Sequence, residues 1–106
     1  MVSSEIIEIV KDYLRELSGK GIYISKAFLF GSQANNTANE ESDIDLMLVS
    51  PLFDGDTDKY MPAIWLSTQR TAHKIEPIIV GEKRFLTDDM SPIIAVVKEQ
   101  GIEIAA

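Results

Sequence analysis

Hydrophobic positions recur along this chain with two different periods, one typical of helices and one typical of strands. Residues 4–18 carry apolar side chains at helical spacing with charged residues between them, which predicts an amphipathic helix. Residues 59–73 show a similar apolar stripe and are predicted to form a second long helix. Ser91-Pro92 has the pattern of a cap followed by proline at the first helical position, so a further helix is expected to begin there and to end at Gly101.

Four apolar stretches are short enough to be strands. The expected strands are residues 22–30, 43–49, 74–80 and 102–104. Between the first two, residues 32–38 are expected to form a short helix or a helical turn. The pattern therefore alternates helices with strands and shows no internal repeat.

The remaining segments, residues 50–57 and 81–89, are expected to be loops, with Lys83 and Arg84 as candidate phosphate or partner contacts in the second. This order predicts an α/β (α+β) fold, in which helices pack on a small mixed β-sheet of about four strands. A chain of 106 residues is expected to be a single domain, residues 1–106. The order of the strands in the sheet does not follow from the pattern.

The stretch from residue 27 to residue 49 carries the candidate chemistry. Its first strand runs into Gly31-Ser32, and its second strand begins with Asp43 and Asp45. Because alternate residues of a strand project to the same face, the two carboxylates are expected to lie side by side, with Ile44 turned into the core. Two neighbouring like charges raise each other's pKa, and a bound dication removes this repulsion.

The two parts of this stretch suit the two parts of a metal–nucleotide complex. Mg²⁺ takes carboxylate oxygens and substrate phosphates in one octahedron, so Asp43 and Asp45 are candidate metal ligands. Gly31 allows a tight turn close to a ligand, and Ser32 is a candidate cap of the following helix. Free amides at such a helix start favour an anion, so the pattern predicts a nucleoside triphosphate site.

Gly31-Ser32 and the run from Ser42 to Leu46, on successive strands, resemble the signature of the DNA polymerase beta-like nucleotidyltransferase superfamily, and more narrowly its minimal nucleotidyltransferase (MNT) branch. That family has a third carboxylate on a later strand, and Glu76 is the acid at the matching place here. The resemblance covers most of the chain and implies a nucleotidyltransferase-like fold. It implies Asp43, Asp45 and Glu76 as catalytic and metal-binding residues, and Gly31 and Ser32 as nucleotide-binding residues.

The reaction implied by the resemblance is transfer of a nucleoside monophosphate, with one or two Mg²⁺ ions and ATP or another NTP as donor. In the minimal branch the acceptor is often a hydroxyl of a partner protein, frequently a helical HEPN protein, and the pair acts as toxin and antitoxin. Since the chain contains little beyond a catalytic core, either the acceptor brings its own surface or a homodimer supplies it.

Two alternatives remain open at this stage. The chain could be a non-catalytic antitoxin, a binding module that acts by contact with a helical partner. It could also be a drug-modifying transferase for aminoglycosides, whose positive charge suits an acidic surface, although such enzymes usually carry an additional domain. The presence of all three acids argues against the non-catalytic alternative.

Composition narrows the classes of partner. The formal net charge is -7, with 10 Lys and Arg against 17 Asp and Glu, so direct binding of free duplex nucleic acid is not expected. The absence of cysteine excludes disulfides and thiolate metal sites. No apolar run is long enough to cross a membrane, and no signal-peptide pattern opens the chain, so a cytoplasmic location is expected.

Some residues depart from the family pattern or allow two interpretations. Relatives often have arginine where this chain has Gln33, and glycine near Asn36, and these differences raise the question of weaker nucleotide binding. Trp65 is expected in the core or at a partner interface rather than on a base. His73, the one histidine, is expected to interact with the dipole at a helix end.

Overall fold

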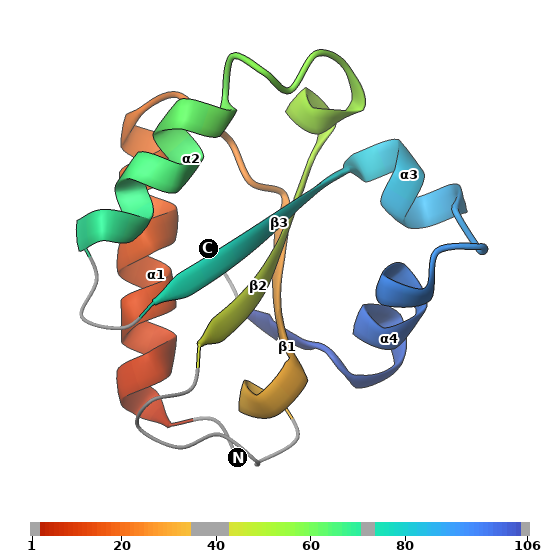
Figure 1. Ribbon diagram of the computed structural model, residues 1–106, viewed down its shortest axis with the longest axis horizontal. Coiled ribbons are helices and arrows are strands. Elements are labelled where there is room, and N and C mark those ends of the chain that lie inside the picture. Colours follow the sequence, from red (N-terminus) through yellow and green to blue (C-terminus); the bar gives the residue numbers. More distant parts are fainter. Residues whose placement is uncertain (1–2, 35–42, 71–73, 105–106) are drawn as a thin grey trace.

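The sheet at the centre of the molecule has four strands with helices on both of its faces (Figure 1). The computed structural model describes residues 3–34, 43–70 and 74–104. The strands are β1 (Lys26–Phe30), β2 (Ile44–Ser50), β3 (Ile75–Gly81) and β4 (Ile102–Ile104), in the spatial order β3-β2-β1-β4. β1 runs antiparallel to β2 and β4, and β2 runs parallel to β3, so the predicted mixed sheet is confirmed.

In the part of the chain that the structure describes, four α-helices pack on the two faces of this sheet. They are α1 (Ser4–Gly19), α2 (Met61–Ser67), α3 (Glu82–Thr87) and α4 (Pro92–Gln100). The predicted starts of the first and last helices are confirmed, because the Ser3 and Ser91 hydroxyls accept hydrogen bonds from the backbone N–H groups of Ile6 and Ile94. None of the helices in the described part of the chain combines the length and apolar character that crossing a membrane requires.

Strand alternation divides the buried apolar side chains into two cores, one on each face of the sheet. The first contains side chains from α1 and α2 together with Leu29, Ile44, Leu46 and Ile75. The second lies under α3 and α4 and contains the intervening positions, which are Phe28, Phe30, Met47, Val49 and Val80 on the strands. Since both faces are covered, β1 and β2 are almost continuously apolar, as the sequence predicted.

Several expected elements differ in extent from the observed ones, including the third strand, which spans Ile75–Gly81 rather than residues 74–80. The first strand begins at Lys26 rather than at residue 22, because its pairing with β2 begins at Lys26, although Ile22 and Ile24 are buried. The second long helix is shorter than predicted: α2 ends at Ser67 and continues as the 3-10 turn η3 (Thr68–Arg70). The predicted start of β2 at residue 43 is one residue early.

The expected loop over residues 81–89 is wrong, because it contains α3. Gly81 precedes this helix and offers no capping side chain, but the Asp54 carboxylate accepts a hydrogen bond of 3.1 Å from the backbone N–H of Lys83. Asp54 belongs to the 3-10 turn η2 (Pro51–Asp54), so the cap comes from 29 residues earlier in the chain. A cap so distant in sequence leaves no local pattern in the segment that becomes the helix.

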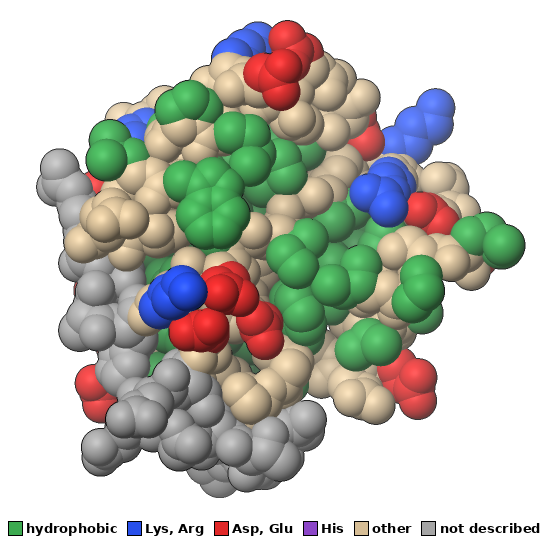
Figure 2. Space-filling model, in the orientation of Figure 1, with side chains coloured by type: hydrophobic (Ala, Val, Ile, Leu, Met, Phe, Trp, Pro, Cys, Tyr) green, Lys and Arg blue, Asp and Glu red, His purple; other side chains and the backbone are tan. Residues whose placement is uncertain are grey.

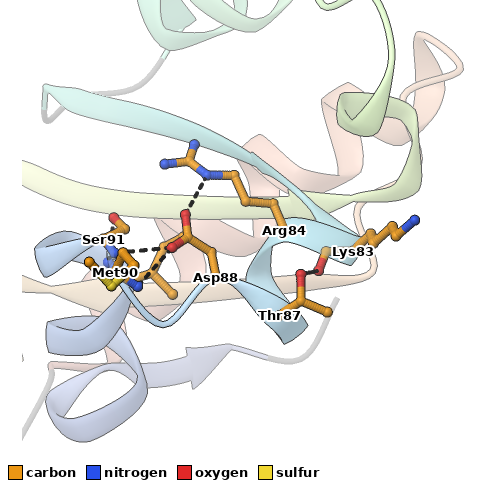
Figure 3. A network of polar contacts seen from close by, with 7 residues as sticks. Lys83, Arg84, Thr87, Asp88, Met90 and Ser91 are labelled. Atoms are coloured by element: carbon orange, nitrogen blue, oxygen red, sulfur yellow. Dashed lines mark hydrogen bonds and ion pairs between the residues drawn. The ribbon is translucent and has the colours of Figure 1, made fainter.

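Asp88 holds the connection between α3 and α4 in place (Figure 3). Its carboxylate accepts hydrogen bonds from the backbone N–H groups of Met90 and Ser91 and from the Arg84 guanidinium. The bond from Met90, followed by that from Arg84, lowers the pKa of Asp88, because each stabilises the ionised carboxylate. The candidate cation Arg84 is therefore engaged in a structural contact.

Candidate active site

The Asp pair lies where β2 begins, on the face of the sheet that α3 and α4 cover only in part. Asp43 immediately precedes β2 and Asp45 is its second residue, and both side chains are half-buried. Ile44 between them is fully buried in the opposite core, as predicted. The alternation of the strand therefore places both carboxylates on one side of the sheet.

Glu76 lies next to this pair on the neighbouring strand. In the parallel register of β2 and β3, Asp45 is the partner of Glu76, just as Asp45 is the partner of Phe30 on β1. Asp45 therefore has Glu76 of β3 on one side and Phe30 of β1, the residue before Gly31, on the other. The structure thus places Glu76 level with Asp45 on adjacent strands, although the two residues are 31 positions apart in the sequence.

Gly31 adopts a conformation that other residues rarely take, with φ of 69°. It also lies against Asp45, because a Cβ atom built on Gly31 would be 2.5 Å from Asp45 Oδ2. The predicted tight turn is therefore confirmed, and the missing side chain has a second role, which is to leave room for the Asp45 carboxylate.

Ser32 lies inside the 3-10 turn η1 (Gly31–Gln33) rather than at its start. The N-cap of this turn is Phe30, and no side-chain hydrogen bond caps it, so the expectation that Ser32 caps the next helical segment is wrong for η1. Ser32 is half-buried beside Gly31. Its role as a phosphate contact stays a prediction.

Burial and neighbouring charges act together on Asp45. Desolvation, then the charge of Glu76, and then the charge of Asp43 raise the pKa of Asp45. Each of these causes disfavours the ionised carboxylate. A cation bound between these side chains would oppose the two electrostatic causes directly.

Lys74 supplies a positive charge beside the acids. Its Nζ atom lies 3.3 Å from Glu76 Oε1 in an ion pair at the protein surface. Its backbone oxygen accepts a hydrogen bond of 2.8 Å from the Ile44 N–H, which fixes the start of β3 against β2. Figure 2 shows acidic side chains with a cationic one beside them, over the ends where β2 and β3 begin.

The donor set matches the predicted metal in its chemistry. Asp43, Asp45 and Glu76 offer carboxylate oxygens only, which are the ligands that Mg²⁺ prefers. Within residues 3–34, 43–70 and 74–104, however, no three His, Cys, Asp or Glu side chains are grouped closely enough to form a metal site. The assignment of these three acids as metal ligands therefore stays a prediction, and Glu76 has Lys74 as its partner.

Gln33 has a role that the sequence did not indicate. Its side chain is buried, with 8% of its surface exposed, and its amide Nε2 donates to the backbone oxygen of Asp43 at 3.4 Å. The side chain thus links the η1 turn to the residue that begins the acid pair. Where relatives often have arginine, this chain has a glutamine whose side chain makes a structural hydrogen bond.

Some of the other candidate residues can be placed and some cannot. Trp65 is 45% exposed on α2, so the expected core role is wrong and an interface role stays a prediction. Asn36, the expected loop over residues 39–42, and His73 lie outside the described residues. Figure 2 shows hydrophobic side chains on the surface beside the acids.

Two comparisons with known proteins found a match. The model of the family described as "Nucleotidyltransferase domain" matches residues 7–101, a range that contains every acid of the site. A solved structure from Sulfolobus solfataricus, of a protein provisionally classed as a nucleotidyltransferase, superimposes with a TM-score of 0.64 at 16% identity. The superposition covers 94% of this chain and 81% of that one, and at this identity it shows the fold alone. No curated protein matches the chain.

Proposed function

We propose that this chain, which belongs to the nucleotidyltransferase domain family, transfers AMP from ATP to a hydroxyl group of an acceptor in a Mg²⁺-dependent reaction. Membership of the family makes the chain a transferase of nucleotidyl groups that uses an NTP. The proposal adds the donor, the metal and the kind of acceptor. The observation that carries it is the register of Asp45 with Glu76 on adjacent strands, beside the Gly31 turn.

Asp43, Asp45 and Glu76 would hold the metal. A bound Mg²⁺ supplies charge neutralisation and a Lewis acid for the phosphates of the donor. Asp43 and Asp45 lie on one side of β2, and Glu76 is level with Asp45, so the three carboxylates face one region of solvent. The raised pKa of Asp45 supports this role, because the acid lies where a cation would lower the electrostatic cost of its charge.

The same carboxylates would manage the proton of the acceptor. In the proposed reaction the acceptor oxygen forms a bond to the α-phosphorus, and the bond from that phosphorus to the pyrophosphate leaving group breaks. The proton of the acceptor hydroxyl passes to Glu76, with Asp45 as the other candidate base. Asp45 is the neighbour of Glu76 on the adjacent strand, so it lies in the same region as the proposed base.

Gly31 and Ser32 would position the β- and γ-phosphates. The turn follows β1 directly and contacts Asp45, so a triphosphate held there would place its α-phosphate near the acids. Positioning of both reactants accounts for much of the rate of such transfers. Gln33 supports this arrangement by joining the turn to Asp43.

We infer that the acceptor hydroxyl belongs to a partner protein, as in a HEPN/MNT toxin–antitoxin pair. Large apolar side chains are exposed on this chain, and such surfaces commonly mark protein interfaces. Those exposed on the helices and their connection are Trp65, Leu66, Leu86, Met90 and Val96. A helical partner that covers one of these groups of side chains would bring its own hydroxyl to the site.

The test is to incubate the chain with ATP, Mg²⁺ and a HEPN protein encoded beside it, and to measure the mass of each protein. The proposal predicts addition of one or more AMP groups to the partner and release of pyrophosphate, both lost in Asp45→Asn. If the partner is neutralised in the cell equally well by wild type and by Asp45→Asn, the chain acts on it by contact and the proposed acceptor is wrong.

A further inference from the structure

We propose that Lys74 is a built-in counter-ion that holds the Glu76 carboxylate in the metal-free protein and competes with the divalent cation for it. The inference rests on the proposed function, since it assumes that Glu76 is a metal ligand. Lys74 would then be a positioning residue, which acts on the metal through Glu76 rather than by contact with the donor.

A backbone hydrogen bond holds Lys74 beside the start of β2, where the Asp pair lies. Its backbone oxygen accepts the 2.8 Å hydrogen bond from Ile44, the residue between Asp43 and Asp45. The parallel register begins at Ile44–Ile75, so Asp43 and Lys74 are the residues that immediately precede the two paired strands. Lys74 immediately precedes β3 and lies two residues before Glu76, and its ion pair with Glu76 shows that the two side chains lie on the same side of the sheet.

The ion pair already engages one of the three candidate metal ligands. Lys74 Nζ lies 3.3 Å from Glu76 Oε1, so that carboxylate oxygen already has a positively charged partner. A divalent cation held by Asp45 and Glu76 would take the same carboxylate and would repel the ammonium group. Metal binding therefore requires Glu76 to exchange one cation for the other.

The exposure of the pair makes the exchange easy. The side chains of Lys74 and Glu76 are 69% and 41% exposed, and ion pairs at such positions contribute little to stability. Lys74 would therefore weaken metal binding without blocking it. In the metal-free protein its positive charge would offset the repulsion between the Glu76 and Asp45 carboxylates. Removal of Lys74 should therefore tighten metal binding to a small, measurable extent.

The chain provides a matched control for the loss of one positive charge. Lys26 pairs with Glu103 at 3.8 Å, and these side chains are 45% and 54% exposed. Lys26 begins β1, whereas the acids lie level with Phe30 at the other end of that strand. Lys26→Met and Lys74→Met change the net charge equally and remove the same type of contact, but only the second lies at the site.

The experiment is a titration with Mn²⁺ alone, followed through the electron paramagnetic resonance signal of the free ion, in the absence of nucleotide. Mn²⁺ favours the same carboxylate ligands as Mg²⁺. Lys74→Met is expected to bind Mn²⁺ about two- to fivefold more tightly than wild type, the range expected for an exposed ion pair. Lys26→Met is expected to match wild type.

A double-mutant cycle with Glu76→Gln separates competition for Glu76 from the general field of a lysine. In the Glu76→Gln background, Lys74→Met is expected to leave the Mn²⁺ affinity unchanged. If Lys74→Met tightens binding equally in both backgrounds, or fails to tighten it in the wild-type background, the inference is wrong. If Asp43→Asn/Asp45→Asn binds Mn²⁺ as well as wild type, the failure lies instead with the proposed metal site.

Discussion

The Asp45 carboxylate occupies the space into which a side chain on Gly31 would extend, with Oδ2 2.5 Å from the position of a Cβ atom there. This contact joins the two halves of the sequence pattern, the turn after β1 and the acids of β2. The pairing of Asp45 with Phe30 across the two strands holds the turn at this place. Substitution of either residue should therefore change the geometry of the site more than it changes the stability of the fold.

Gly31→Ala should combine backbone strain with displacement of the Asp45 carboxylate. The positive φ costs alanine roughly 1–2 kcal/mol, and a misplacement of about 1 Å at a reacting group can lower the rate by about 100-fold. Gly21→Ala is the matched control, because Gly21 has φ of 81° and no atom within 4 Å of its built Cβ. We expect similar losses of stability, measured by urea unfolding, and a loss of transfer only in Gly31→Ala. Equal transfer rates in the two variants would contradict the role given to this contact.

Asp45→Asn should lose activity and gain stability at neutral pH. The folded protein raises the pKa of Asp45, so the folded state binds this proton more tightly than the unfolded state does. Ionisation of Asp45 therefore costs stability as pH rises through the folded pKa, and the asparagine variant avoids that cost. Thermal melts should show a higher Tm for Asp45→Asn at pH 7 in metal-free buffer, a difference that disappears below the ordinary pKa of 3.8. Asp58→Asn, which removes the same charge from an exposed position, is the control and should show no such gain in Tm. A lower Tm for Asp45→Asn than for wild type would contradict the prediction, since it would show that the charge of Asp45 is already compensated in the folded protein.

Asp54→Ala should destabilise α3, because it removes the carboxylate that accepts from the Lys83 N–H. Loss of a helix cap costs about 0.5–2 kcal/mol, and Asp54→Asn, which keeps an acceptor, should lose much less. Gly81→Ala should act in the same direction, since its Cβ would collide with the Asp54 carboxylate. Chemical denaturation of the three variants checks this order. If Asp54→Ala and Asp54→Asn unfold alike, the hydrogen bond does not stabilise the helix.

Asp88 should make the free energy of unfolding depend on pH in the acidic range. Its folded pKa lies below the ordinary value of 3.8, so the unfolded state takes up this proton first as pH falls. The stabilisation is present above pH 3.8 and is lost as pH falls through the folded pKa. Asp88→Asn should therefore unfold more easily than wild type at pH 7 and approach it at low pH. Its neighbour Asp89, which is exposed, provides the control Asp89→Asn, for which no such convergence is expected.

The sequence was sufficient for those features that local pattern determines. The alternation around Ile44 predicted correctly which side chains of β2 enter the core, and Ser91-Pro92 predicted the start of α4. The mixed sheet followed from the alternation of helices and strands. The position of β3 at the edge of the sheet is consistent with Pro77, which lacks a backbone N–H.

Features that depend on contacts distant in sequence could not be predicted. α3 depends on Asp54, so the segment that follows Gly81 appeared to be a loop. Trp65 fitted an apolar stripe, but α2 buries Ile64 and Ser67 and leaves the Trp65 side chain 45% exposed. The partners of Gln33 and Lys74 became visible only once the turn, β2 and β3 were placed side by side.

The most direct test of the proposed site is calorimetric titration of ATP with Mg²⁺ into wild type and into Asp43→Asn/Asp45→Asn. A control of equal charge is Asp58→Asn/Asp89→Asn, which changes two exposed acids outside the site. We predict metal-dependent binding by wild type and by the control, and binding at least about tenfold weaker in Asp43→Asn/Asp45→Asn, a difference of about 1.4 kcal/mol. Equal affinity in all three proteins would contradict the assignment of Asp43 and Asp45 to the metal and the nucleotide.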